Sequence, residues 1–222
     1  AGVVQGLAEA CSALDLPVVG GNVSLYNGAG DTAVRPTPVV CTVGVIEDLA
    51  RSRGAGFVAA GDAVLLVQTV PPTLAASLFW ERFGGGLEGR PPRPRFEPLR
   101  ALIDWLVDTA RTGSLRSAHD VAHGGLAVAL AECALLGGLG LEAALPPGGE
   151  AVEVLFGEAP GAVVVSCAAT RRAEVVESAR ARGLAPILLG RTIAEPVLRI
   201  GCGPVRIETQ LAQLRAVWGG AP

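Results

Sequence analysis

The chain has 222 residues, half of them hydrophobic (50%), and a formal net charge of only −3 at pH 7. Disordered proteins combine low hydrophobicity with high charge, so this composition predicts a folded globular protein. The slight acidic excess argues against a nucleic-acid partner, and no apolar run reaches the roughly 18 residues of a membrane span. All 18 basic residues are arginines, which excludes a Schiff-base lysine, a lysine general base and a P-loop lysine.

The first predicted element is a helix over residues 3–14. Val3, Leu7, Cys11 and Leu14 recur at the spacing of an amphipathic helix. No capping residue precedes this helix, and the chain contains no methionine. Both features favour the interpretation that the chain is a fragment of a longer protein.

Two β-prone segments follow, with a polar loop between them. The apolar run 16–19 predicts a short strand that ends at Gly20-Gly21, and the β-branched run 39–46 predicts the strongest strand of the chain. Residues 51–61 are rich in Gly, Arg and Ala, which is typical of a link between domains. We therefore expect two domains, 1–50 and 51–222.

The second predicted domain alternates between strands and helices. Strands are predicted over 62–70, 138–145, 162–167, 187–190 and 197–200, and helices over 73–80, 99–112, 124–136, 170–182 and 207–218, with a loop over 84–94 and an ambiguous segment at 152–156. The first and fourth helices would be capped by Thr73 and Thr170. This interleaving predicts an α/β or α+β class, with helices layered on a sheet.

The five cysteines, Cys11, Cys41, Cys133, Cys167 and Cys202, are far apart in the chain. No pair has the spacing of a zinc site. Each lies in an apolar run, where a reduced cysteine behaves as a small hydrophobic side chain. Reduced thiols fit a cytoplasmic location.

The segment GGNVS, residues 20–24, is the strongest candidate for a binding site. Gly20 and Gly21 permit positive φ and the close approach of a phosphate. Asn22 offers a carboxamide oxygen of the kind that Mg²⁺ accepts, and Ser24 offers a hydroxyl to a substrate. Gly-Gly-Asn is also common turn chemistry, and the segment matches no standard nucleotide fingerprint. From the residues alone, both interpretations stay open.

The segment SAHDVAHGGL is the second candidate. His119, Asp120 and His123 lie beside a predicted helix start, where an anion would be favoured. The alternative is a helix cap with two solvated histidines. A zinc site would need a further ligand from elsewhere in the chain.

Two further features carry charge near predicted elements. Glu158 precedes a buried strand, where a lone carboxylate is usually solvated. Arg90, Arg93 and Arg95 have side chains that could bind phosphate. Because their loop is rich in Gly and Pro, the simpler interpretation is that these arginines keep the loop soluble.

Taken in order, four segments resemble the second half of the phosphoribosylformylglycinamidine synthase family, part of the PurM-like (aminoimidazole ribonucleotide synthetase) superfamily. They are GLAEACSALDLPVVGGNVSLYN, PTPVVCTVGVIEDL, SAHDVAHGGLAVALAECAL and LFGEAPGAVVVS. The resemblance covers nearly the whole chain. It implies an α/β fold with a PurM-like C-terminal α/β/α sandwich domain over 51–222, preceded by an incomplete PurM-like N-terminal domain over 1–50.

The resemblance also implies a reaction. Members of the family convert formylglycinamide ribonucleotide, ATP and ammonia into formylglycinamidine ribonucleotide, ADP and phosphate, with Mg²⁺. A glutaminase subunit or domain supplies the ammonia, together with a small accessory subunit. Gly21 then matches an ATP contact, Asn22 a Mg²⁺ ligand and Ser24 a substrate contact. The family's catalytic histidines and its ATP-contacting lysine lie in the first half of the chain, so we expect this fragment alone to be inactive.

Some positions depart from the family's pattern. Gly28-Ala29 replaces residues that the family has after its tyrosine, His123 stands where the family has Asp, and Pro160 and Ala162 stand where it has Ser and Arg. These departures put an auxiliary nucleotide site in doubt. Two alternatives therefore stay open: a scaffold half with vestigial sites, or another ATP-using member such as aminoimidazole ribonucleotide synthetase.

Overall fold

The computed structural model divides the chain into two compact units, Ala1–Glu47 and Asp48–Pro222. The structure describes residues 2–23, 28–33, 37–84, 86, 89–145 and 148–218. None of the helices in these ranges is both long enough and apolar enough to cross a membrane.

The first unit contains one helix and one short hairpin. Helix α1 (Gly2–Leu14) forms as its apolar spacing predicts, and β1 (Gly28–Ala29) pairs antiparallel with β2 (Thr32–Ala33). The predicted strands over 16–19 and 39–46 are wrong, because neither segment pairs with any described strand. A strand needs a neighbour for its N–H and C=O groups. The side chains of Val19 and Val43 are accordingly 94% and 91% exposed.

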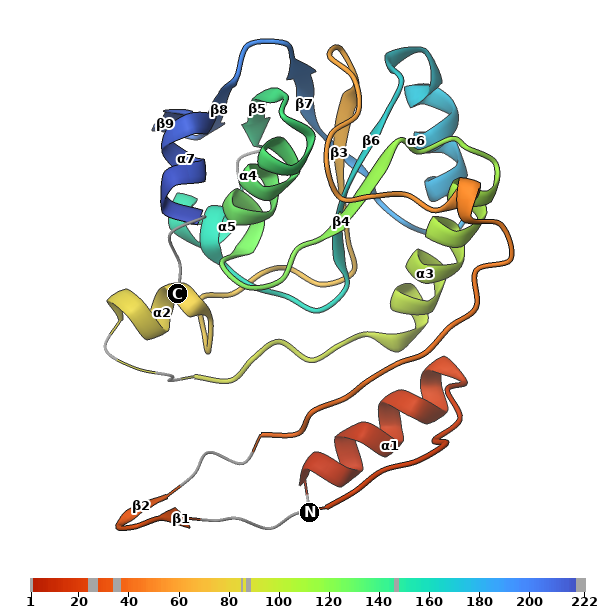
Figure 1. Cartoon of the computed structure of the whole chain (residues 1–222), viewed down its shortest axis with the longest axis vertical. Coiled ribbons are helices and arrows are strands. Elements are labelled where there is room, and N and C mark those ends of the chain that lie inside the picture. The colour runs from red at the N-terminus through yellow and green to blue at the C-terminus, as the bar shows by residue number, and fades with distance from the viewer. Residues whose placement is uncertain are drawn as a thin grey trace. The chain divides into compact units, whose positions relative to one another are not determined.

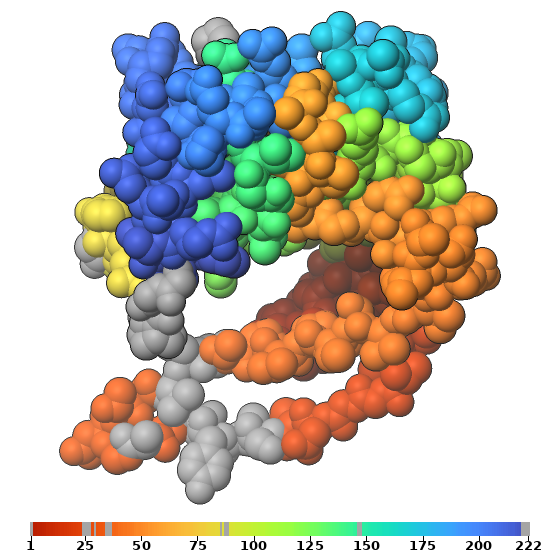
Figure 2. All heavy atoms as spheres, turned by 45° about the horizontal axis from the view of Figure 1, so that its top comes forward, coloured from red at the N-terminus to blue at the C-terminus, as the bar shows by residue number. Residues whose placement is uncertain are grey.

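The second unit is built on a seven-stranded sheet (Figure 1). Its strands are β3 (Ala63–Gln68), β4 (Ser117–Asp120), β5 (Gly140–Leu145), β6 (Ala162–Cys167), β7 (Ile187–Ile193), β8 (Val197–Cys202) and β9 (Val205–Gln210). Their spatial order is β4-β6-β3-β7-β5-β8-β9, and every pair is antiparallel except β5 and β8. In Figure 2 the C-terminal residues (blue) and α6 (cyan) lie on opposite sides of this unit, with residues of β3 (orange) between them.

Helices cover both faces of the sheet. They are α2 (Leu78–Phe83), α3 (Phe96–Arg111), α4 (Gly125–Gly137), α5 (Ala151–Phe156), α6 (Arg172–Arg180) and α7 (Leu211–Trp218), with 3₁₀ turns η1 (Leu49–Arg51) and η2 (Ala169–Arg171). Residues of α4, α5 and α7 share one core with Val64 and Leu66, whereas α3 and α6 share the other with Leu65 and Val67. Alternate residues of one strand thus supply both cores. The predicted α/β/α sandwich is confirmed.

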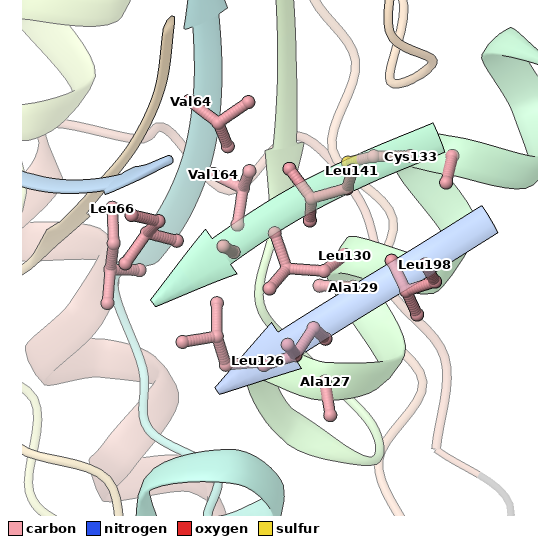
Figure 3. Packing of buried hydrophobic residues seen from close by; sticks show 14 of the residues in the cluster. Val64, Leu66, Leu126, Ala127, Ala129, Leu130, Cys133, Leu141, Val164 and Leu198 are labelled. Atoms are coloured by element: carbon pink, nitrogen blue, oxygen red, sulfur yellow. The ribbon is translucent and has the colours of Figure 1, made fainter. Parts of the chain in front are cut away.

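Helix α4 is the most deeply packed helix of the first of these cores. Leu126, Leu130 and Cys133 point toward the sheet residues Val164 and Leu198 (Figure 3). A helix that is apolar all round must be buried. Leu130 is accordingly fully buried, and α4 can be displaced only by exposing much of the core.

Arginines connect the link that precedes the sheet to helix α3 of the same unit. Asp48 caps η1 by accepting the N–H of Ala50 (3.1 Å). The Arg51 guanidinium donates to the carbonyl of Arg111 (3.1 Å), and Arg53 donates to the carbonyls of Ala110 (3.2 Å) and Leu115 (2.8 Å). Carbonyls at a helix C-terminus lack partners within the helix. The link therefore caps α3.

The link also approaches α4 through Phe57. The N–H of Phe57 donates to the carbonyl of Cys133 (3.0 Å). A Cβ on Gly137 would lie 2.1 Å from the carbonyl oxygen of Phe57, so only glycine fits at this close approach.

Several predicted boundaries are wrong for identifiable reasons. The predicted helix over 207–218 begins only at Leu211, because residues 205–210 pair with β8 as β9. The side chain of Ser77, not Thr73, caps α2 by accepting the N–H of Trp80 (3.1 Å). Thr170 lies inside η2 and makes no cap to α6, and the ambiguous segment near 152–156 forms α5.

We expect Leu130→Ala to lower the free energy of unfolding by about 3 kcal/mol, because it leaves a cavity beside the sheet. Leu136→Ala, on the same helix but at a side chain that is 54% exposed, should cost less than about 1 kcal/mol. Urea unfolding of the two variants measures both values. Equal losses would contradict the packing of α4.

The cysteines should differ sharply in reactivity. Burial raises the pKa of Cys133 to about 12, aided by the charge of Glu132, and burial also raises the pKa of Cys167. Since the thiolate is the nucleophile, we expect both to react with Ellman's reagent at pH 8 only after denaturation. Cys41 is exposed, contrary to the sequence expectation, and should react at once. Timed labelling with peptide mass spectrometry distinguishes them, and equal rates for Cys41 and Cys133 would refute the burial.

Candidate functional site

The GGNVS segment lies in the irregular chain that follows α1. Gly20, Gly21 and Asn22 are exposed, and a Cβ on either glycine would meet no atom within 4 Å. Neither glycine adopts positive φ in this structure, and the phosphate contact expected for the pair stays a prediction. Ser24 lies outside the described residues.

Asn22 can supply one hard oxygen to a metal ion. Among the described residues, no group of three or more His, Cys, Asp or Glu is placed to hold a metal. Mg²⁺ prefers about six oxygen ligands, several of them carboxylates or water. The donor set of the described residues is therefore incomplete for this ion.

The second unit contains a cavity of about 660 Å³ at the edge where β4 ends and β6 begins. Helix α3 forms one wall with Leu99, Ile103 and Leu106, and the end of β4 with the start of β6 and their adjoining loops (118–123 and 158–163) form the other. The cavity thus brings together the SAHDVAHGGL and LFGEAPGAVVVS segments. The sequence indicated each segment separately but not their meeting.

Glu158 connects three segments beside this cavity through hydrogen bonds. Its Oε1 accepts the N–H of Leu78 (2.8 Å), the first residue of α2, and the N–H of Gly124 (2.9 Å), which precedes α4. Its backbone exchanges two hydrogen bonds with Thr73 (2.9 and 3.1 Å). Helix N-termini carry partial positive charge, which favours a carboxylate there. Glu158 is thus half-buried and caps two helix starts through Oε1, so the expectation of a lone solvated carboxylate is only partly correct.

The approach of α4 to Glu158 depends on a glycine. Gly125 has φ of +74°, and a Cβ there would lie 2.6 Å from the carbonyl oxygen of Gly157. Only glycine satisfies both the left-handed backbone and the contact. The Gly-Gly pair in the sequence thus brings the start of α4 against the loop that carries Glu158.

The two histidines have different surroundings. His119 is largely buried, with Nδ1 2.8 Å from the carbonyl oxygen of Asp120 and Nε2 3.3 Å from Oε2 of Glu132. His123 is exposed. The prediction of two solvated histidines therefore holds only for His123.

The cavity presents negative charge. Its polar side chains are those of His119, Asp120, His123 and Glu158, and the other described lining residues are apolar or glycine. Arg90, Arg93 and Arg95 are absent from the described lining, although Pro91 and Pro92 of the same loop belong to it. The phosphate role considered for these arginines finds no support at this cavity.

Two substitutions of Glu158 should show how much of its effect on stability comes from accepting the two N–H groups and how much from its charge. We expect Glu158→Ala to lower the free energy of unfolding by about 2 kcal/mol, because two N–H groups lose a charged acceptor. Glu158→Gln keeps an oxygen acceptor and should cost about half as much. Glu177→Ala, at an exposed site on α6, serves as the control and should change stability by less than about 0.5 kcal/mol.

Hydrogen exchange gives a second readout for Glu158. In Glu158→Ala the amides of Leu78 and Gly124 should exchange faster than in the unaltered chain. Unchanged protection at both amides would show that the carboxylate does not hold the helix starts.

Comparison with known proteins extends the resemblance seen in the sequence. The PurL subunit of phosphoribosylformylglycinamidine synthase from Cutibacterium acnes is 40% identical over 191 residues, which is 86% of this chain and 25% of that protein. The PurL subunit from Thermobifida fusca is 40% identical over 212 residues, or 95% of this chain and 27% of that protein. The chain therefore spans about a quarter of the length of these relatives.

Solved structures and family models agree on the fold. Thermotoga maritima PurL, in a structure complexed with ATP, matches with a TM-score of 0.71 at 18% identity, covering 96% of this chain and 35% of that one. The family model described as "AIR synthase related protein, C-terminal domain" matches residues 59–203, well over half of the chain. The chain belongs to the AIR synthase-related family, and residues 59–203 are its C-terminal domain.

Proposed function

We propose that the chain is part of an ATP-dependent ligase of de novo purine biosynthesis. The ligase converts formylglycinamide ribonucleotide, ATP and glutamine-derived ammonia into formylglycinamidine ribonucleotide, ADP and phosphate. The observation that carries this proposal is the similarity to synthase subunits along most of the chain. The chain spans about a quarter of those subunits, so we assign the activity to a longer protein and expect this piece alone to be inactive.

The domain assignment is part of the same proposal. Residues 51–222 would form the second PurM-like C-terminal domain, and 1–50 the end of an incomplete N-terminal domain. The exposed, β-prone segments 16–19 and 39–46 support this division, because they have the composition of strands without partners in the described chain.

Three residues of the GGNVS segment would contribute to the active site. Gly21 would contact ATP, Asn22 would provide one ligand to Mg²⁺, and Ser24 would contact the substrate. Both Gly21 and Asn22 are exposed, and a Cβ on Gly21 would meet no atom within 4 Å, which supports these roles. The remaining metal ligands and the catalytic groups would come from the first half of the ligase, since the described residues do not complete a metal site.

The partners follow from the same relationship. The relatives are named as subunits of the synthase, which supports a glutaminase subunit or domain and a small accessory subunit as the source of ammonia. A cytoplasmic location is supported by the five cysteines, all of which are free thiols.

A scaffold role is the second candidate. The incomplete metal donor set and the acidic cavity favour a half whose own sites are vestigial. In this case the chain would support the fold of the ligase without contacting its nucleotide.

Replacement of Asn22 distinguishes the two candidates. In the complete ligase, Asn22→Ala should lower kcat/KM for ATP by about tenfold at limiting Mg²⁺, because one oxygen ligand is lost. Asn22→Asp, which keeps an oxygen at the same position, should retain more activity. Steady-state rates across a Mg²⁺ series measure both effects. Activity of Asn22→Ala equal to that of the unaltered ligase at every Mg²⁺ concentration would favour the scaffold.

A further inference from the structure

The cavity between α3 and the Glu158 loop has the shape of a small-molecule site. Its volume of about 660 Å³ lies within the range of about 300–1,000 Å³ in which proteins bind such ligands. Every described lining residue belongs to the second unit, so the site is independent of the GGNVS segment.

The walls of this cavity favour an apolar body. Leu99, Ile103 and Leu106 form a stripe along α3, and Pro91 and Pro92 belong to the same lining. The side chain of Ile103 is 41% exposed, so its apolar surface is only partly covered by the chain itself. A flat hydrocarbon group bound there would remove this surface from water.

The polar end of the cavity favours a cation over an anion. Its two acidic side chains, Asp120 and Glu158, lie beside His119 and His123, and the described lining contains no Arg, Ser or Thr. The N–H groups of Leu78 and Gly124, which would otherwise attract a phosphate, already donate to Oε1 of Glu158. Oε2 of Glu158 makes no hydrogen bond to another described residue in the structure and retains its acceptor capacity.

We infer that this cavity binds a small organic monocation, with its ammonium group at Asp120 and Glu158 and its apolar body on α3. An ammonium has donors only, which matches two carboxylates without competing for the helix N–H groups. Charge complementarity and the apolar stripe thus select the same ligand class. This site goes beyond the proposed ligase reaction and does not depend on it.

The test uses three ligands of nearly equal shape and different charge. Calorimetry on the 222-residue chain would compare 3-phenylpropylammonium, 3-phenylpropanol and 3-phenylpropionate. The cation should bind about tenfold more tightly than the anion, because one meets opposite and the other like charge. ADP serves as a fourth probe and should bind more weakly than the cation.

Variants locate the binding. Asp120→Asn, at a side chain that is 80% exposed, should leave folding intact and weaken cation binding about threefold. Glu158→Gln should weaken it about tenfold while retaining an oxygen for the helix N–H groups. Ile103→Arg places a cation in the wall and should abolish binding of the ammonium probe. Glu177→Gln, remote from the lining, should leave the affinity unchanged.

Several outcomes would overturn the inference. One is binding of 3-phenylpropionate or ADP as tightly as the cation. Another is cation binding that survives Ile103→Arg, or that falls equally in Glu177→Gln and Asp120→Asn. Asp120 is exposed, so we expect Asp120→Asn to stay folded. Its effect on cation binding can therefore be measured even if Glu158→Gln unfolds the domain.

Discussion

The hydrogen-bonding needs of extended backbone determine which parts of this chain become regular structure. In the second unit every strand has a neighbour, from β4 at one edge to β9 at the other. In the first unit the segment 39–46 has an equally β-branched sequence but stays irregular, because no described strand accepts it. The difference lies in the available partners and not in intrinsic propensity. A sheet is therefore a property of the whole set of strands that a chain brings together.

This constraint also explains how much of the fold could be predicted. Helices α3 and α4 and strand β6 follow from local signals, such as an apolar stripe, a terminal glycine and a short β-branched run. The start of α7 was misplaced because residues 207–210 were predicted as helix from their sequence, whereas they pair with β8 as part of β9. The prediction for segment 39–46 shows the opposite error: a strand was predicted from a β-branched run, but no described strand pairs with it. Pairing joins residues distant in sequence, and periodicity does not contain that information.

The sites show the same limit. His119, Asp120 and Glu158 were each visible in the sequence as polar residues near element ends, yet nothing in their spacing placed them at one cavity. They meet because β4 pairs with β6, which sets Asp120 opposite Val163. Glu158 reaches Leu78 and Gly124 across 80 and 34 positions of sequence. Its role was missed because a capping carboxylate is usually sought within the helix it caps.

Because of the arginine contacts of the link, the folded unit begins earlier in the chain than the matched family domain. The family match begins at residue 59, but Arg51 and Arg53 already cap the last turn of α3. A piece cut at residue 59 would leave these carbonyls uncapped. If gene duplication or fusion moved this domain into another protein, the link from Asp48 onward would have to move with it. The capping contacts of the link therefore place the start of the folding unit before the first strand of the sheet.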